Sequence, residues 1–522
     1  MVTAYTEILT DGDDIFVDSP SRNTLIKGLA GNDILYGKDG DDVIYGGDDN
    51  ISLLDGNDTL YGGAGNDVLF GGQGSDVVYG DQGDDAIIID PNFLDVAVVD
   101  KYYGGEGNDT FYSSKSGGQP VGTQLIAYGG KGDDTYELAS ADESLKIVEE
   151  ANEGIDTVIM RLPTKITLPD NVENMLIDLG GEGIGNSLNN VMASNFIYTR
   201  VTLYGLAGND TLTGANHRLG DELYGGSGND TLKGGGGNDI LDGGTGNDIF
   251  QSASTNEFNS GVLLSDSDTL TGGKGNDIYY ADTSDKIIEN KNEGIDTLFA
   301  VPTDGFSTDF YLPENVENLT IMDPDYAVTG TVYFDGFGNA QRNKIEGNSY
   351  DNALFGNGGN DFLIGGEGDD ELDGGTGRDR YDGGTGNDQF KYDPADFKGY
   401  VKENQYLGGT GTDSLVLPVA FSHLDLTKLP DNMIRGIDVI EAEPLKGGSA
   451  SLTLAASDVI AISDNGTLRI EDGFGAGILS VYSENQGWVL SGTEVIDDVT
   501  YEVYKVGQAT LVVDADLGGV IS

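Results

Sequence analysis

The chain has 522 residues, of which 82 are glycine, 12 are proline and none is cysteine. The low proline content excludes a collagen-like protein, and the lack of cysteine excludes disulfides and cysteine metal sites together. With 90 acidic and 27 basic residues, the net charge of -63 excludes nucleic acid and anionic membranes as partners and requires a cationic one.

The N-terminal segment carries no export signal of the usual kind. Residues 1–14 contain neither a basic segment nor an apolar run, so they do not resemble a secretory signal peptide. No apolar run in the chain reaches transmembrane length, so no transmembrane segment is expected. An exported protein with this beginning would need a signal elsewhere.

Glycine-rich stretches repeat a five-residue pattern of glycine, any residue, aspartate, any residue and an apolar residue. Runs such as GGAGNDVLF at 62–70 and GGEGDDELD at 365–373 place successive aspartates nine residues apart. Glycine permits a tight turn, and the apolar residue begins a short strand. The pattern occurs at Asp14 and Asp413, and also at Asp33, Asp42, Asp58, Asp67, Asp76, Asp85, Asp109, Asp134, Asp210, Asp230, Asp239, Asp248, Asp277, Asp361, Asp370, Asp379 and Asp388.

Two such units predict one coil of a parallel β-roll, with two short strands facing each other across a thin core. Units two apart then stack on the same side, which places Asp58 over Asp76 at about 5 Å, the spacing of neighbouring strands. Carboxylates this close repel by about 3 kcal/mol at an effective dielectric near 20, so the roll needs a counter-ion. Hard oxygen ligands in a chain with 2 histidines and no cysteine favour calcium.

The tandem unit resembles the RTX (repeats-in-toxin) nonapeptide GGxGxDxUx, a calcium-binding repeat. The resemblance implies that multiple calcium ions are bound by turn carbonyls and by the carboxylates at the sixth position. The candidate metal ligands are therefore the repeat aspartates from Asp33 to Asp388. Glu222 is interpreted as a replacement for a repeat aspartate. Four matches are set aside because no repeat in register surrounds them: Asp49, Asp156, Asp296 and Asp438.

The segments between the repeats are duplicated. Residues 129–160 match 272–300, and LPDNVENMLI from Leu168 matches LPENVENLTI from Leu312. A weaker third copy begins at Leu429. We therefore expect an all-β chain of calcium-bound β-rolls (a β-solenoid) with connectors between them. The expected parts are β-roll blocks at 11–136, 204–280 and 346–415, β-rich connectors at 137–203 and 281–345, and a C-terminal β module at 416–522.

In the C-terminal module the glycine-aspartate rhythm stops, and the sequence predicts short strands with turns and places Trp488 in the core. The module resembles the C-terminal part of RTX adhesins exported by type I secretion. That resemblance implies an uncleaved signal at the chain end, in the region of residues 514–522, and an extracellular location at the cell surface.

The chain is not expected to be an enzyme. His217 and His423 lie far from an HExxH pair, and no serine stands in GxSxG, so no catalytic residue is assigned. The resemblance leaves an RTX-linked enzyme as an outlier. Two hypotheses remain: a calcium-binding structural protein of the bacterial surface layer, filament or matrix that self-associates into a homo-oligomer or filament, and an adhesin that binds surface polysaccharide or other cells.

Tyrosines at the ninth repeat position point outward by strand alternation. Two roles are open for them: packing along the sheet edge, or contact with another sheet or with a glycan. These tyrosines are Tyr36, Tyr45, Tyr61, Tyr79 and Tyr224.

Overall fold

The computed structural model describes residues 5–47, 56–89, 97–113, 123–139, 145–195, 198–252, 266–302, 307–324, 332–397, 405–418, 423–430, 432–442, 449–472, 478–483, 487–497, 499–515 and 517. The chain divides into two compact units, Met1–Lys274 with Ser284–Lys286, and Gly275–Thr283 with Ile287–Ser522. Among the described residues no helix is long and apolar enough to cross a membrane.

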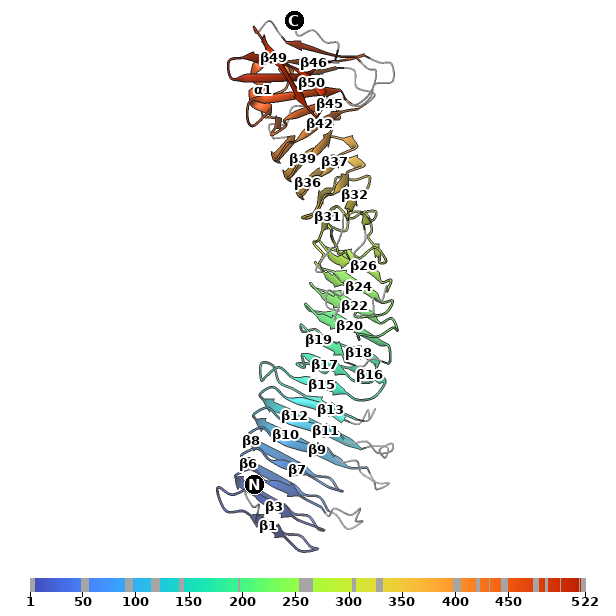
Figure 1. Cartoon of the computed structure of the whole chain (residues 1–522). Coiled ribbons are helices and arrows are strands. Elements are labelled where there is room, and N and C mark those ends of the chain that lie inside the picture. Colours follow the sequence, from blue (N-terminus) through green and yellow to red (C-terminus); the bar gives the residue numbers. More distant parts are fainter. Residues whose placement is uncertain are drawn as a thin grey trace. The chain divides into compact units, whose positions relative to one another are not determined.

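The first unit is a stack of coils in which short parallel strands alternate between facing sheets, drawn as successive rungs from blue to green in Figure 1. One sheet runs through the whole unit, and each strand pairs in parallel with the next. Its strands are β1 (Tyr5–Ile8), β3 (Thr24–Lys27), β5 (Val43–Tyr45), β7 (Val68–Phe70), β9 (Ala86–Ile89), β11 (Thr110–Ser113), β13 (Thr135–Leu138), β15 (Thr157–Met160), β17 (Asn174–Ile177), β19 (Val191–Ser194), β21 (Thr211–Thr213), β23 (Thr231–Lys233) and β25 (Ile249–Gln251).

Two further parallel sheets lie on the opposite side of these coils. The first consists of β2 (Ile15–Val17), β4 (Ile34–Asp39), β6 (Thr59–Ala64), β8 (Val77–Gln82), β10 (Val99–Glu106), β12 (Gln124–Lys131) and β14 (Leu145–Val148). The second consists of β16 (Thr164–Thr167), β18 (Gly181–Ile184), β20 (Val201–Ala207), β22 (Glu222–Ser227), β24 (Ile240–Thr245) and β26 (Thr269–Lys274). The strand β28 (Lys286–Ile288) contains residues of both units.

The register confirms the predicted β-roll. Leu60 aligns with Val78 and Leu69 aligns with Ile87, so equivalent residues of consecutive repeats stack eighteen positions apart. All four side chains are 0% exposed. Because strand alternation turns only one or two side chains of each short strand inward, the core is one side chain deep on each side.

Glycines close the turns where coils stack. Gly228 has a φ of +126°, and a Cβ there would lie 1.8 Å from the carbonyl oxygen of Gly208 in the neighbouring coil. Only glycine combines this left-handed conformation with such a close approach of two backbones.

The outward tyrosines of the first block pack on one another. Successive rings stack face to face with centroids 4.6 to 4.9 Å apart, and each is half-buried. The stack contains Tyr36, Tyr61, Tyr79, Tyr103 and Tyr128. Tyr45 stacks on Phe70 and Tyr224 on Tyr204 in the same manner.

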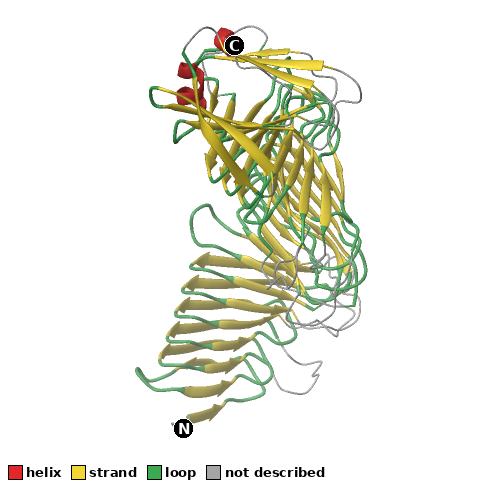
Figure 2. Ribbon diagram, turned by 45° about the horizontal axis from the view of Figure 1, so that its top comes forward, coloured by secondary structure: helices red, strands yellow, loops and turns green. Residues whose placement is uncertain are grey.

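The second unit continues the same kind of coil. Its first parallel sheet contains β27 (Ile278–Ala281), β29 (Thr297–Ala300), β31 (Asn318–Ile321), β33 (Lys344–Glu346), β36 (Phe362–Glu367), β39 (Arg380–Thr385), β41 (Tyr406–Thr410) and β44 (Ile434–Arg435). Its second sheet contains β30 (Thr308–Tyr311), β32 (Phe334–Phe337), β34 (Ala353–Phe355), β37 (Glu371–Asp373), β40 (Gln389–Lys391), β42 (Ser414–Leu417), β45 (Val439–Ala442), β47 (Thr467–Asp472), β51 (Ala509–Asp514), β50 (Val499–Val506) and β49 (Val489–Ile496). Figure 2 shows these strands in yellow.

The C-terminal module departs from a pure β structure. Within it, β43 (His423–Asp425), β46 (Ser449–Leu454) and β48 (Ile478–Ser483) form a small sheet, whereas β35 (Gly358–Gly359) and β38 (Thr376–Gly377) form a two-stranded sheet in the third repeat block. A 3-10 turn, η2, covers Leu426–Lys428.

The prediction of strands alone in this module is wrong at α1 (Ala456–Ile462). The Asp458 carboxylate accepts a hydrogen bond from the N–H of Ala455 at the helix start, and Val459 and Ile462 bury one face. Trp488 is half-buried rather than part of the core.

Adjacent residues of β24 test the thin core. Replacing Leu241, which is 0% exposed, by alanine is expected to lower the free energy of unfolding by about 2–5 kcal/mol in saturating calcium. Replacing Ile240, which is 43% exposed, by alanine is expected to cost less than about 1 kcal/mol. Urea unfolding followed by circular dichroism measures both, and equal losses would contradict this assignment of the inner face.

Candidate metal centre

The repeat aspartates lie in the turns directly before strands, in two columns along each block. In one column the backbone N–H of Asp67 donates to Oδ1 of Asp85 (2.7 Å), and the N–H of Asp85 donates to Oδ1 of Asp109 (2.8 Å). In the other column the N–H of Asp58 donates to Oδ1 of Asp76 (2.8 Å). Each carboxylate therefore caps the backbone of the preceding coil with one of its two oxygens.

The second oxygen, Oδ2, points toward a glycine of its own turn. A Cβ at Gly62 would lie 2.3 Å from Oδ2 of Asp67 and 2.8 Å from the carbonyl oxygen of Gly80 in the next coil. A Cβ at Gly365 would lie 2.2 Å from Oδ2 of Asp370, with the Gly383 carbonyl oxygen at 2.5 Å. The missing side chain of the glycine thus leaves room beside a carboxylate oxygen and a carbonyl oxygen.

Many of these Oδ2 atoms are buried without a hydrogen-bond donor. The aspartates with such an oxygen, taken from the described residues, include Asp33, Asp42, Asp67, Asp85, Asp109, Asp134, Asp210, Asp230, Asp239, Asp268, Asp361, Asp370, Asp379, Asp388 and Asp413. A buried charged oxygen without a partner is costly, whereas carboxylate and carbonyl oxygens are the ligands that calcium prefers. The donor set therefore fits a calcium ion.

Burial also disturbs the acid-base chemistry of these carboxyls. Desolvation raises the pKa of Asp42 to about 6, of Asp67 to about 7 and of Asp85 to about 8, with neighbouring aspartates adding to the effect. In the third block it raises the pKa of Asp370 to about 8. Without a cation these turns favour the protonated, uncharged carboxyl.

A second ladder runs along the outer side of the turns, at the fifth repeat position. The N–H of Asn108 donates to Oδ1 of Asp84 (2.8 Å), and the N–H of Asn229 donates to Oδ1 of Asn209 (2.7 Å). These side chains are exposed, and either asparagine or aspartate supplies the accepting oxygen. The fifth position therefore serves coil stacking without needing a charge.

The columns contain two aspartates that match the five-residue pattern outside the tandem repeats. The connector residues Asp156 and Asp296, which the sequence analysis sets aside, accept from the N–H groups of Asp134 (2.9 Å) and Asp277 (2.8 Å). They take part because the connector coils keep the stacking through Gly154 and Gly294, although the glycine pair that opens each repeat is lost. The sequence NEGIDT, which both connectors share, could have identified these two aspartates.

Other members lack the glycine two residues earlier and so escape the pattern. Asp100, Asp268 and Asp396 accept from the N–H groups of repeat aspartates in the preceding coils. Asp438 donates its N–H to the carbonyl of Asp413 (2.9 Å). Asp49 lies outside the described residues.

The interpretation of Glu222 as a replacement aspartate is wrong. Asp221 occupies the column: its Oδ1 accepts from the N–H of Val201 (2.8 Å), and its own N–H donates to Asp239. Glu222 is the first residue of β22 and points outward. The insertion before it lengthens the spacing from Asp210 to Asp221 to eleven residues, two more than the nine-residue repeat unit.

In three coils asparagine takes the column position. The Nδ2 group of Asn190 donates to the carbonyl of Glu173 (3.1 Å), while its Oδ1 accepts from the N–H of Asn186 (2.8 Å). Asn343 and Asn352 make equivalent bonds with Asn339 and Asn348. The amide oxygen lies beside the turn glycine, with Oδ1 of Asn190 at 2.4 Å from a Cβ at Gly185, and Nδ2 donates on the other side, so the column position carries no charge to neutralise.

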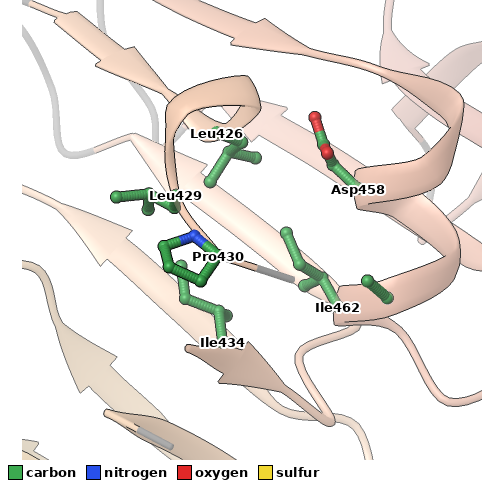
Figure 3. Close-up of a pocket in the computed structure, with 7 residues that line it drawn as sticks. Leu426, Leu429, Pro430, Ile434, Asp458 and Ile462 are labelled. Carbon is green, nitrogen blue, oxygen red and sulfur yellow. The ribbon is translucent and has the colours of Figure 1, made fainter. Parts of the chain in front are cut away.

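Among the described residues, neither the two histidines nor the pocket of the C-terminal module forms a second kind of metal site. His217 is buried and bonds to the Thr199 carbonyl, while the exposed His423 bonds to Ser451. A pocket in the C-terminal module is lined mainly by apolar side chains from η2, the two residues after Lys428, β44 and α1, as Figure 3 shows. Asp458, the acidic residue of this pocket, is engaged as the cap of α1.

Comparison with known families agrees with this geometry. The model of the RTX calcium-binding nonapeptide repeat (4 copies) matches residues 21–50, 54–87, 99–115, 201–217, 219–250, 264–285, 337–372 and 355–390. No curated protein matches the chain. The repeats bind Ca2+, and the matched segments contain the glycine-flanked columns described above.

The pKa shifts predict opposite effects of pH with and without calcium. Since burial raises the pKa of Asp42, Asp67 and Asp85 from 3.8 to about 6–8, the calcium-free fold is most stable below about pH 4 and loses stability as the pH rises to 8. With calcium, protons compete with the ion, so stability falls as the pH falls. Urea unfolding followed by circular dichroism from pH 4 to 8 gives the midpoint at each pH. The midpoint should fall with rising pH without calcium and rise with it in calcium, and the same trend in both series would contradict this account.

Proposed function

Because the chain carries RTX calcium-binding nonapeptide repeats, we propose that it is a secreted structural protein of the bacterial cell surface that folds and self-associates when calcium binds. The observation that carries the proposal is the column of buried aspartate oxygens without donors, repeated through both units. Folding places these charges in the interior, so a cation that neutralises them stabilises the folded state by mass action.

The proposed ligands are the repeat aspartates from Asp33 to Asp388. Each would offer Oδ2 to an ion held beside the turn glycine, and at sites such as Gly62 and Gly365 a glycine carbonyl of the next coil would be a second ligand. The ion would then join two consecutive coils. Calcium would provide the cross-links that disulfides provide in other extracellular proteins, since the chain has no cysteine.

Exposed strand edges support self-association. Within the described residues β1 pairs with β3 alone and β2 with β4 alone, so each has an unpaired edge. Ile8, Ile15 and Val17 on these strands are 63%, 75% and 54% exposed. Unpaired edges with apolar side chains are templates for another chain, and the net charge of -63 would keep calcium-free chains apart.

The tyrosine stack favours the structural role over glycan binding. Its ring faces lie against each other at 4.6 to 4.9 Å, so they are not available to sugar rings. The adhesin hypothesis therefore has to rely on another surface.

The proposed export route is type I secretion. RTX repeats are typical of proteins that leave the cell by this route, and the C-terminal module would carry the signal. Of the segment 514–522, residues 516 and 518–522 lie outside the described part of the chain.

Two adjacent aspartates test the proposed ligands. In Asp85→Asn, the new Oδ1 can still accept from Asp67, but Nδ2 replaces the oxygen beside Gly80. We expect about one bound calcium fewer and a loss of about 1–3 kcal/mol in the free energy of unfolding in calcium.

The matched control is Asp84→Asn, which removes the same charge and keeps the acceptor for the N–H of Asn108. Its stability should change by less than about 0.5 kcal/mol. Calcium titration calorimetry and urea unfolding compare the two, and equal effects would count against Asp85 as a ligand.

Sedimentation velocity and electron microscopy test self-association. Monomers are expected in chelator, and larger assemblies in millimolar calcium. The double variant Ile15→Lys with Val17→Lys places charges on the β2 edge. It should raise the protein concentration required for assembly at least tenfold. The control, Val191→Lys with Ile240→Lys, adds the same charge to exposed positions of strands paired on both sides.

Wild-type protein that stays monomeric in calcium at high concentration would refute the structural proposal. If that monomer also bound polysaccharide or cells, the adhesin hypothesis would replace it.

A further inference from the structure

Each duplicated connector brings three buried carboxylates together where the nonapeptide repeats end. In the first copy these are Asp134, Glu149 and Asp156, with one oxygen of each within 4.8 Å of the others. Asp277, Glu289 and Asp296 form the same arrangement in the second copy. All six are at most 8% exposed. The two glutamates lie outside any nonapeptide, so the repeat rule does not lead to them.

The first cluster contains oxygens that no protein group satisfies. Oδ2 of Asp134 and Oε2 of Glu149 are buried and have no hydrogen-bond donor, although these residues are only 1% and 5% exposed. A Cβ at Gly129 would lie 2.2 Å from both Oδ2 of Asp134 and Oε1 of Glu149, so the two side chains converge on one point. In the second copy Oε2 of Glu289 is likewise buried without a donor.

The composition of these clusters differs from that of the repeat sites. Beside Gly62 and its equivalents the second oxygen is a glycine carbonyl, whereas beside Gly129 it is the Glu149 carboxylate. A buried tyrosine holds each glutamate: the Tyr136 hydroxyl donates to Glu149, and the Tyr279 hydroxyl donates to Glu289. Among the ion pairs of the described residues, none places a lysine or arginine on the first cluster.

We propose that each carboxylate cluster is a divalent-cation site that binds calcium more tightly than the repeat sites do. Affinity for calcium increases with the number of charged ligands and with the rigidity of the site, and these clusters supply three carboxylates with one fixed by a tyrosine. They fill first as calcium rises. The connector coils are then ordered before the repeats, and each provides a preformed surface on which the neighbouring repeats stack.

The competing explanation is a purely structural one, in which the glutamate is a protonated carboxylic acid bonded to the tyrosine. Glutamine resembles that neutral form, so Glu149→Gln with Glu289→Gln separates the two explanations. The measurement is a titration of the full-length chain with calcium against a chromophoric chelator. We expect the double variant to lose the two tightest ions, one from each cluster, and each single variant to lose one.

The control is Glu150→Gln with Glu314→Gln, which removes the same charge from exposed positions and should leave the isotherm unchanged. If the glutamine variant does not fold in saturating calcium, Glu149→Asp with Glu289→Asp decides. These variants keep the charge but shorten the reach, and a calcium affinity at least tenfold lower is expected for the tightest ions. Glutamine or aspartate variants that retain both tight ions would overturn the proposal.

Discussion

The fold depends on one interaction, the hydrogen bond between the carboxylate of each column aspartate and the backbone of the preceding coil. The two oxygens of the carboxylate have different roles in it. Oδ1 accepts the N–H of the preceding coil and so makes one coil continue into the next. That bond fixes the rest of the carboxylate in the interior, where Oδ2 of many column aspartates, such as Asp67 and Asp85, has no donor from the protein. The group that joins the coils therefore also creates the charge that has to be neutralised, so stacking is linked to cation binding or protonation of these carboxyls.

Glycine makes this arrangement possible by leaving room for an ion. Beside Gly62 and Gly365 a single methyl group would collide with both the aspartate oxygen and the carbonyl of the following coil. The high glycine content therefore serves the metal centre as well as the turns. Asparagine at 190, 343 and 352 shows the alternative, because its amide hydrogens satisfy the carbonyls that surround it. The chain thus contains coils with buried carboxylate oxygens that lack a donor and coils in which an uncharged amide takes their place.

The inner and outer faces of the coils have different tasks. Inside, one or two apolar side chains per strand, such as Leu60 and Leu69, give a core too thin to resist the repulsion of the columns without a counter-ion. Outside, the tyrosine stack runs along successive strands and adds contacts between coils rather than a surface for ligands.

The sequence alone was sufficient for the coil, the nine-residue unit and the identity of the ion, because glycine spacing and the position of aspartate are local properties of each repeat. The tertiary structure decided which carboxylates share a column. Asp42 and Asp67 are 25 residues apart yet bond as directly as Asp67 and Asp85, which are 18 apart. Asp156, Asp221 and Glu149 join the columns or their ends without the nine-residue spacing, since stacking of coils, and not spacing along the chain, brings their oxygens together. The helix at Ala456–Ile462 was missed for a related reason: its short apolar run is compatible with a strand until the Asp458 cap and the packing of Val459 and Ile462 select the helix.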